Sequence, residues 1–213
     1  MAQLYGVDVS EAQGQINWDA LNAVSNFAVI RSCFGTARKD HQLDRNRSEA
    51  HRVQAAAGPL GIGYYHYAYP EDNSPQAEAA FFAASVTPLA AGDLLALDWE
   101  ERYSGDHVAW CLAFLQAVTA RTGIQPLIYL NQSTISSHGW RPVIDAGFSL
   151  WLADWDGSRT GPGVHTPWPF TAMRQWTDAD TVAGIGDRVD GDVFYGDFAA
   201  WAAYAHHAPA HVS

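Results

Sequence analysis

Hydrophobic and polar residues alternate along the chain in a pattern that predicts eight β-strands. Each expected strand is a short apolar run that glycine, proline or polar residues bound on either side. Stretches with helical periodicity separate the first five runs, whereas the last three follow one another with little helix between them. The predicted strands lie within residues 4–10, 27–33, 60–69, 93–101, 126–130, 148–153, 171–176 and 189–194.

Helices are expected between the early strands because apolar residues recur there every three or four positions. Ser74-Pro75 is a typical helix start, with serine as the cap and proline in the first turn, and Gly123 is a typical helix end. We expect one domain over residues 1–205 and a flexible tail or linker at 206–213. The predicted helices cover residues 17–25, 44–57, 74–86, 106–122 and 132–137, with a frayed helix after 198 and loops at 35–43 and 157–169.

This order of elements indicates an α/β fold. Five strands that alternate with helices, followed by three strands without them, fit an irregular TIM-like (β/α)5(β)3 barrel. In such barrels the chemistry takes place at the carboxyl ends of the strands. The side chains expected there are Asp8, Tyr65, Tyr67, Asp98, Glu100, Tyr129, Trp151, Gln175, Trp176, and Asp190 or Asp192.

Composition narrows the possible classes of protein. A chain of 213 residues with 48% hydrophobic content suits one well-cored domain, and it contains no apolar run of about 18 residues that could span a membrane. The formal charge of −11 argues against a nucleic-acid partner. Cys33 and Cys111 are too few for a disulfide framework or a metal cluster, so we expect two buried thiols. The sequence predicts a soluble monomer.

Asp98 and Glu100 follow a strongly apolar strand and are the central candidates for catalysis. Because side chains alternate across a strand, the two carboxylates share a face, with α-carbons about 6.6 Å apart. A glycosidase needs one protonated carboxyl and one charged partner, and an ionised Asp98 would raise the pKa of Glu100. A lone Asp-x-Glu is more often a solvated strand end. Here acids at the ends of the first and last strands favour a functional site.

The aromatic residues and His66 allow more than one interpretation. Trp151 and Trp176 could offer flat apolar platforms to sugar rings, although each could equally be a core residue. His66 is more simply explained as a structural histidine than as a catalytic one. The concentration of aromatic residues at strand ends indicates a sugar-binding cleft more strongly than any single ring does.

Together these residues resemble a glycoside hydrolase family 25 lysozyme, the Chalaropsis-type N-acetylmuramidases of phage endolysins, bacteria and fungi. The resemblance covers residues 4 to about 198, and its segments occur in the order found in the family. Each segment alone is a weak signal, but the whole set is specific. The matching segments are Gly6-Val7-Asp8-Val9-Ser10, Phe27-Ala28-Val29-Ile30-Arg31, Gly63-Tyr64-Tyr65-His66-Tyr67-Ala68, Leu97-Asp98-Trp99-Glu100, Leu127-Ile128-Tyr129, Leu150-Trp151-Leu152-Ala153, Gln175-Trp176, and Asp190 to Phe194.

The resemblance implies cleavage of the β-1,4 bond between N-acetylmuramic acid and N-acetylglucosamine in peptidoglycan, without a metal or cofactor. It assigns the proton donor to Glu100 and the partner carboxylate to Asp98. The acetamido group of the substrate could itself attack the anomeric carbon, and Asp98 would then orient and stabilise it. The resemblance also implies that the following residues line the cleft: Asp8, Asp190, Tyr65, Tyr129, Trp151 and Gln175.

Two departures from the family pattern concern the walls of the cleft. Asp190-Gly191-Asp192 carries a second aspartate where relatives often have asparagine, which leaves open which of the two faces the cleft. Trp155 stands where tyrosine is usual. The chain start lacks the basic and apolar regions of a signal peptide, so we expect either a phage enzyme released from the host cytoplasm to the wall, or a secreted enzyme.

Three other classes remain open on the sequence. A chitinase-like glycosidase would also use acids at the fourth strand, although its usual longer Asp-rich motif is missing here. A metal-dependent hydrolase could use Asp8, Asp98, Glu100 and His66 as ligands. A glycan-binding module without catalytic activity would bind sugars but release no reducing ends.

Overall fold

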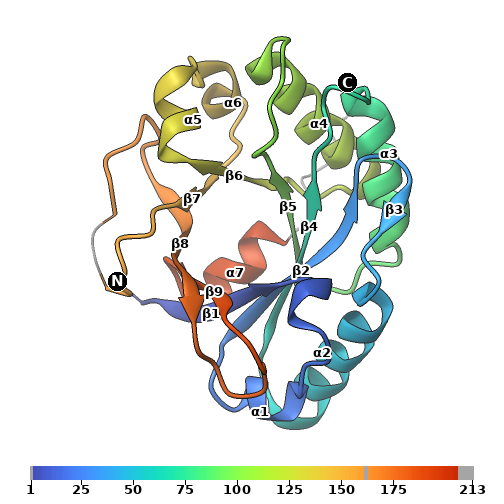
Figure 1. Ribbon diagram of the computed structural model, residues 1–213, viewed down its shortest axis with the longest axis vertical. Helices are drawn as coiled ribbons and strands as arrows, with labels where there is room; N and C mark the ends of the chain where they lie inside the picture. Colours follow the sequence, from blue (N-terminus) through green and yellow to red (C-terminus); the bar gives the residue numbers. More distant parts are fainter. Residues whose placement is uncertain (1, 161–162, 206–213) are drawn as a thin grey trace.

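The strands of the computed structural model, which describes residues 2–160 and 163–205, close into a barrel (Figure 1). In the ring, β1 pairs with β2 on one side and with β9 on the other, and neighbours run parallel except for β8–β9 and β9–β1. The eight predicted strands are confirmed. They are β1 (Leu4–Val9), β2 (Phe27–Phe34), β4 (Gly61–Tyr67), β5 (Asp93–Asp98), β6 (Leu127–Asn131), β7 (Leu150–Ala153), β8 (Thr171–Asp180) and β9 (Val189–Phe194).

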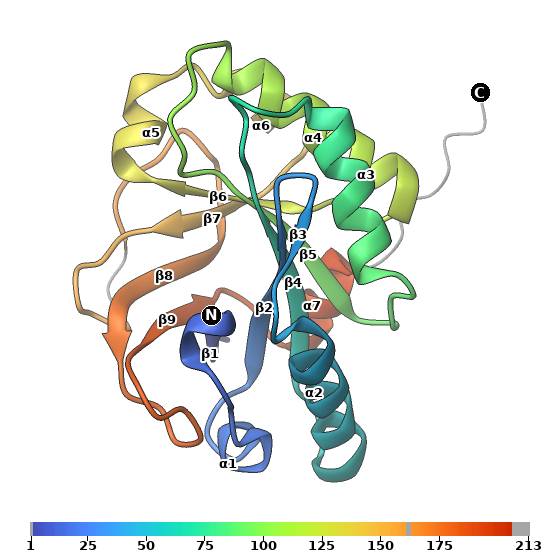
Figure 2. The same cartoon turned by 45° about the vertical axis from the view of Figure 1, so that its right-hand side comes forward.

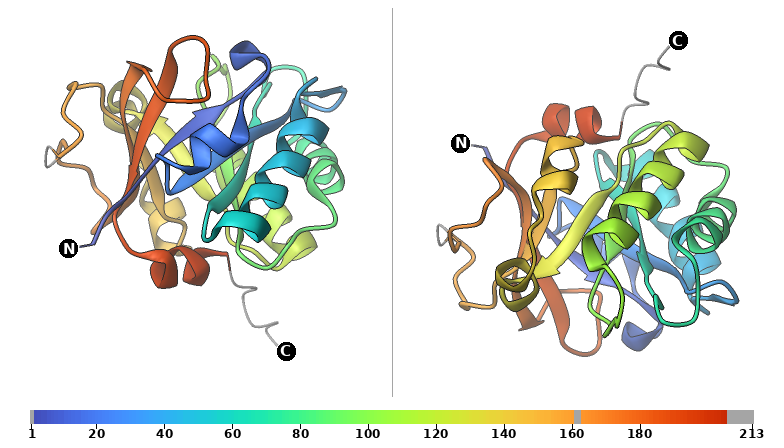
Figure 3. Two further views of the ribbon diagram at one scale, coloured as in Figure 1. Left: turned by 90° about the horizontal axis from the view of Figure 1, so that it is seen from below. Right: turned by 90° about the horizontal axis from the view of Figure 1, so that it is seen from above.

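Helices cover only part of the barrel wall. Figures 2 and 3 show α2, α3 and α4 on the side of the early strands, while β8 and β9 carry no helix outside them. The final helix crosses the end of the barrel opposite the mouth. The helices are α1 (Trp18–Asn22), α2 (Leu43–Ala57), α3 (Pro75–Val86), α4 (His107–Thr122), α5 (Gln132–Ser137), α6 (Arg141–Asp145) and α7 (Phe198–Tyr204).

Several boundaries differ from those expected. Helix α1 ends at Asn22 instead of residue 25, and β8 continues to Asp180 because it forms a hairpin with β9. The predicted loop 35–43 contains a two-residue strand, β3 (Arg38–Lys39), which pairs with the end of β2. The short helix α6 and the 3-10 turn at Glu11–Gln13 were not predicted, because elements of five and three residues are too short to show a hydrophobic periodicity. The predicted tail 206–213 lies outside the described residues.

Local signals explain the helix ends. The Ser74 hydroxyl accepts a hydrogen bond from the backbone N–H of Ala77, and Asp106 Oδ1 accepts one from the N–H of Ala109. Gly123 ends α4 at a φ of 76°, a left-handed conformation that favours glycine. No helix within the described part of the chain has the length and apolar character needed to cross a membrane.

Strand alternation creates two separate cores. Leu95 and Leu97 of β5 face outward into a core shared with the helices, whereas Leu94 and Ala96 face the barrel interior. Trp201 of α7 closes the interior at the bottom, and its indole N–H donates to the Gly92 carbonyl at 3.0 Å. The barrel is therefore packed solid below its mouth. The same alternation turns the next inward positions of β5 into the mouth itself.

Candidate active site

The ends of three strands bring carboxyl groups into the barrel mouth. Asp98 ends β5, and Glu100 follows two residues later on the same face. Asp8 of β1 stands opposite Asp190 of β9 in the antiparallel register. Asp8 and Asp98 are buried, whereas Glu100 is exposed to solvent at the rim. The cluster thus joins buried acids to one that water can reach.

These acids border a cleft with a volume of about 280 Å³. The structure brings nine of the side chains expected at the strand ends together there, from seven strands and the segment after β5. The cleft is lined by Asp8, Ser10, Ala12, Gln13, Arg31, Tyr65, Tyr67, Asp98, Glu100, Tyr129, Trp151, Trp155, Gln175, Asp178 and Asp190.

Two predicted site residues do not line the cleft. Asp192 lies beneath it, fully buried, where its Oδ1 accepts a hydrogen bond from Trp151 Nε1 at 2.8 Å. Trp176 follows Gln175 in β8 where the register with β9 shifts, and its ring lies under the guanidinium of Arg159 instead of lining the cleft. The prediction of Trp176 as a platform for sugars is therefore wrong. Asp190, and not Asp192, faces the cleft.

Gln175 links the aromatic wall to the acids. Its Oε1 accepts hydrogen bonds from the Tyr129 hydroxyl at 2.7 Å and from Trp155 Nε1 at 2.6 Å. Its Nε2 donates to Asp8 Oδ2 at 2.7 Å. Because both ends of the amide are engaged, the orientation of Gln175 is fixed, and with it the positions of the groups around it.

The acids of the mouth hold protons more tightly than ordinary carboxyls. Burial raises the pKa of Asp98 well above its usual range, and the nearby Glu100 and Asp8 raise it further. Burial and the charge of Asp8 raise the pKa of Asp190 to about 8. Burial also raises the pKa of both Asp8 and Asp192 well above the usual range, and the charge of Asp192 adds to the rise at Asp8. The cluster is therefore partly protonated at neutral pH.

The pKa of Glu100 is also raised, as the sequence led us to expect, but the main cause differs. Partial removal of its carboxyl from water in the mouth contributes most and the charge of Glu101 adds to it, while the nearby Tyr129 hydroxyl opposes the rise. Repulsion between the charges of Asp98 and Glu100 disfavours ionising both carboxyls at once, and it raises the pKa of Asp98. Asp98 Oδ1 is buried and has no hydrogen-bond partner among the described residues.

Arg31 is a site residue that the sequence analysis did not select. Its guanidinium lines the cleft and lowers the pKa of Asp98, but it also pairs with Asp40 at 2.9 Å and with Glu11 at 3.7 Å. It therefore neutralises the cluster only in part. Its place at the carboxyl end of β2 was the signal available in the sequence. Trp155 lines the cleft wall, where the sequence analysis placed it, whereas Asp178 was missed because it lies past the predicted end of its strand.

His66 faces away from the mouth, into the core between β4 and the helices. Its Nε2 lies 2.6 Å from Glu78 Oε2, its Nδ1 lies 3.2 Å from Cys33 Sγ, and its ring stacks on Phe114. The prediction of a structural histidine is confirmed, so the set of metal ligands considered above is not assembled. Within residues 2–160 and 163–205, no group of three or more histidine, cysteine or acidic residues could hold a metal ion. Cys33 and Cys111 are free buried thiols, as predicted.

A barrel mouth that gathers protonated and ionisable carboxyls between aromatic rings is the site of a glycoside hydrolase. The family model described as "Glycosyl hydrolases family 25" matches residues 7–185, and the chain belongs to this family. The match confirms both the resemblance noted in the sequence and the barrel fold expected from it.

Individual relatives agree with this family. Lysozyme M1 of Streptomyces globisporus is 28% identical, over 94% of this chain and 70% of its own length. The crystal structure of the bacterial lysozyme from Streptomyces coelicolor superimposes with a TM-score of 0.83 at 26% identity, and covers 98% of this chain and 100% of that one. The structure of the CTP1L endolysin has a TM-score of 0.77 at 26% identity, and covers 94% of this chain and 69% of that one.

The raised pKa of Asp190 predicts how stability depends on pH. Between an unfolded pKa of about 3.9 and the folded value of about 8, the folded chain keeps a proton that the unfolded chain loses. Asp190 therefore destabilises the fold progressively as pH rises through this window. We expect Asp190→Asn to raise the free energy of unfolding by about 1–2 kcal/mol at pH 8 and to leave it unchanged near pH 4.

Urea unfolding of both proteins at pH 4, 6 and 8 measures this difference. The control is Asp187→Asn, which removes an exposed carboxylate from the turn before β9 and should give no such pH-dependent gain. A gain for Asp190→Asn that is equal at all three pH values would contradict the expected proton uptake.

Proposed function

We propose that this chain is a lysozyme that hydrolyses the β-1,4 bond between N-acetylmuramic acid and N-acetylglucosamine in bacterial peptidoglycan. The observation that carries the proposal is the pair of inward-facing acids at the end of β5, both with raised pKa values, in a family 25 barrel. The names of the relatives support the substrate. The glycan strands of peptidoglycan would be its partner, and we expect the enzyme to act as a monomer.

Glu100 is assigned the role of general acid and base. Its pKa is raised, so a proton is available near neutral pH, and its position at the rim lets it reach the glycosidic oxygen of a chain lying in the cleft. After the leaving group departs, the ionised Glu100 can take a proton from the water that completes hydrolysis. Exposure to solvent suits both steps, because the leaving sugar and the incoming water use the same side.

Asp98 is assigned to the acetamido group of the substrate. Asp98 Oδ1 is buried without a partner at the cleft, so it can accept the acetamido N–H when the sugar binds. The acetamido oxygen then attacks the anomeric carbon as the glycosidic bond breaks and Glu100 protonates the leaving oxygen. Water opens the resulting cyclic intermediate and gives its proton to Glu100. While Glu100 carries the proton of the pair, Asp98 is ionised, and its carboxylate stabilises the positive charge that develops on the sugar.

The remaining acids and Gln175 would shape the electrostatic field around the reacting sugar. Asp8 and Asp190 stand on the opposite side of the mouth from β5, where their carboxyl oxygens point partial negative charge at a positively charged transition state. Tyr129 and Trp151 form the floor, and Tyr65 packs edge-on against Trp151. We also propose that the enzyme reaches the wall either from the host cytoplasm at phage-induced lysis, as its likeness to an endolysin suggests, or by secretion.

Substitution of the general acid tests this assignment. We expect Glu100→Gln to lower kcat on purified peptidoglycan by about 10²- to 10⁴-fold or more, because the amide cannot deliver a proton. The release of reducing ends measures the rate, and urea unfolding checks that the fold is retained. Asp187→Asn is the control, since this exposed carboxylate in the turn before β9 does not line the cleft. The assignment is wrong if the two variants lose activity equally or if Glu100→Gln keeps normal activity.

The stereochemistry of the product tests the role of Asp98. Attack by the acetamido group followed by attack of water inverts the anomeric carbon twice, so we expect net retention of the β configuration. Proton NMR during hydrolysis of a soluble glycan distinguishes the anomers before they equilibrate. A first-formed α anomer would exclude the acetamido mechanism and would require a water molecule between the acids and the sugar.

A further inference from the structure

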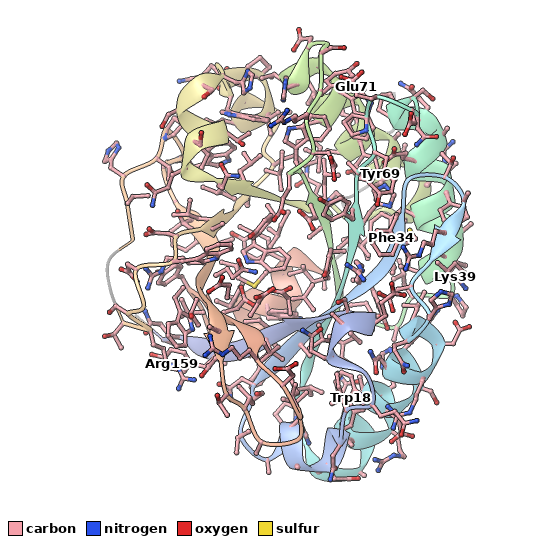
Figure 4. The ribbon with its side chains drawn as sticks, viewed as in Figure 1. Trp18, Phe34, Lys39, Tyr69, Glu71 and Arg159 are labelled. Carbon is pink, nitrogen blue, oxygen red and sulfur yellow. The ribbon has the colours of Figure 1, made fainter. Side chains whose placement is uncertain are left out.

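Aromatic rings continue out of the cleft beyond Tyr67, over the segment that follows β4. Tyr67 lines the cleft, and Tyr69 meets it edge-on with ring centroids 5.6 Å apart. Phe34 of β2 lies against both, at 6.0 Å from Tyr67 and stacked at 6.3 Å on Tyr69. Figure 4 shows Phe34 and Tyr69 close together on this side of the molecule. We call these three residues the tyrosine shelf.

The shelf is held in place before any ligand arrives. The backbone N–H of Tyr69 donates to the buried carboxylate of Glu78, which is itself bound to His66. The Tyr67 hydroxyl donates to Glu101 Oε1 at 3.0 Å. Tyr69 nevertheless remains 36% exposed, although it is a large aromatic residue. A ring that is fixed and also open to solvent can bind a ligand with little loss of conformational entropy.

The charges around the shelf favour a neutral ligand. The guanidinium of Arg31 lies 4.0 Å from the centre of the Phe34 ring, and that of Arg38 lies 4.6 Å from it. Both arginines are paired with acids, Arg31 with Asp40 and Arg38 with Glu11. Neither of these two arginines is therefore free to bind an anionic group such as the stem peptide. A pyranose ring, with its apolar C–H face, suits an aromatic surface of this kind.

The position of the shelf relative to the acids suggests which sugar it binds. In the order of the barrel ring, β4 stands directly across from β8, four strands away in either direction. On the β8 side, Trp155 is 57% exposed and its indole N–H is bonded to Gln175. Two exposed aromatic rings, Trp155 and Tyr69, thus lie on opposite sides of the mouth. A polymer that crosses the cleft would rest on one as it enters and on the other as it leaves.

We propose that the tyrosine shelf is a glycan-binding subsite for sugar rings that lie beyond those adjoining the scissile bond. It binds N-acetylhexosamine rings of long strands and makes the enzyme favour long glycan strands over short ones. The proposal rests on the proposed function, since the cleft must hold the same glycan that Glu100 and Asp98 cleave.

Kinetics on strands of increasing length test the subsite. Peptide-free glycan strands of four, six and eight or more sugars are hydrolysed by the wild-type enzyme, Tyr69→Ala and Tyr69→Phe. We expect the ratio of wild-type to Tyr69→Ala kcat/KM to rise from less than twofold on four sugars to about five- to tenfold on the longest strands. The rise should appear in KM, and Tyr69→Phe should restore wild-type behaviour because it keeps the ring.

Phe170→Ala is the matched control, because Phe170 is an exposed aromatic residue just before β8, at the end of the barrel away from the mouth. It should alter kcat/KM by less than twofold at every length. A constant ratio for Tyr69→Ala across all lengths, whether near one or large, would overturn the subsite. If the wild-type enzyme releases no muramic acid ends from any strand, the proposed function fails first, and this outcome is distinct from the other two.

Discussion

Burial of several carboxyl groups in one barrel mouth is the constraint on which the site depends. An aspartate taken out of water next to other acids cannot easily ionise, so the fold must keep some of these groups protonated or hydrogen-bonded. The structure does both. Burial raises the pKa of Asp8 and Asp192, Trp151 donates a hydrogen bond to Asp192 and Gln175 donates one to Asp8, and Arg31 supplies partial compensation. Because ionising these buried carboxyls costs free energy, the cluster keeps a proton that catalysis can use.

The barrel can tolerate this cost because its two cores are separate. The outward side chains of each strand pack against helices, and below the mouth the inward ones form a dry plug that Trp201 closes. Trp99 shows how the two layers cooperate at the site. It lies between Asp98 and Glu100 in sequence but points outward, fully buried, with its ring 5.0 Å from that of Trp110. Anchoring this one residue outside the barrel turns both acids inward.

The sequence predicted those parts of the structure that follow from periodicity. Runs of apolar residues located all eight barrel strands, and alternation placed Asp98 and Glu100 on one face. The same rule could not place Trp176, because the register of β8 with β9 shifts there and simple alternation does not hold. It could not separate Asp190 from Asp192, because residues two apart share a face, and only depth in the barrel distinguishes them.

Other features depend on contacts between distant segments and had no local signal. Tyr69 belongs to an aromatic cluster only because its ring stacks on Phe34. Trp155 is held at the cleft by a hydrogen bond to Gln175, which lies 20 residues away. The strand β3 exists only as the partner of the end of β2. The cause of the raised pKa at Glu100 also depends on burial that sequence spacing does not reveal. The hydrophobic pattern of the sequence thus predicted the barrel strands and the two central acids, whereas most contacts in the walls of the cleft could be identified only from the structure.

The identity of the sugar at the newly formed reducing end tests the central claim most directly. Purified peptidoglycan is digested with the enzyme, the products are reduced with borohydride, and mass spectrometry identifies the reduced terminal sugar. The account predicts N-acetylmuramitol at the new ends. N-acetylglucosaminitol at those ends, or release of stem peptides without any new reducing end, would contradict it.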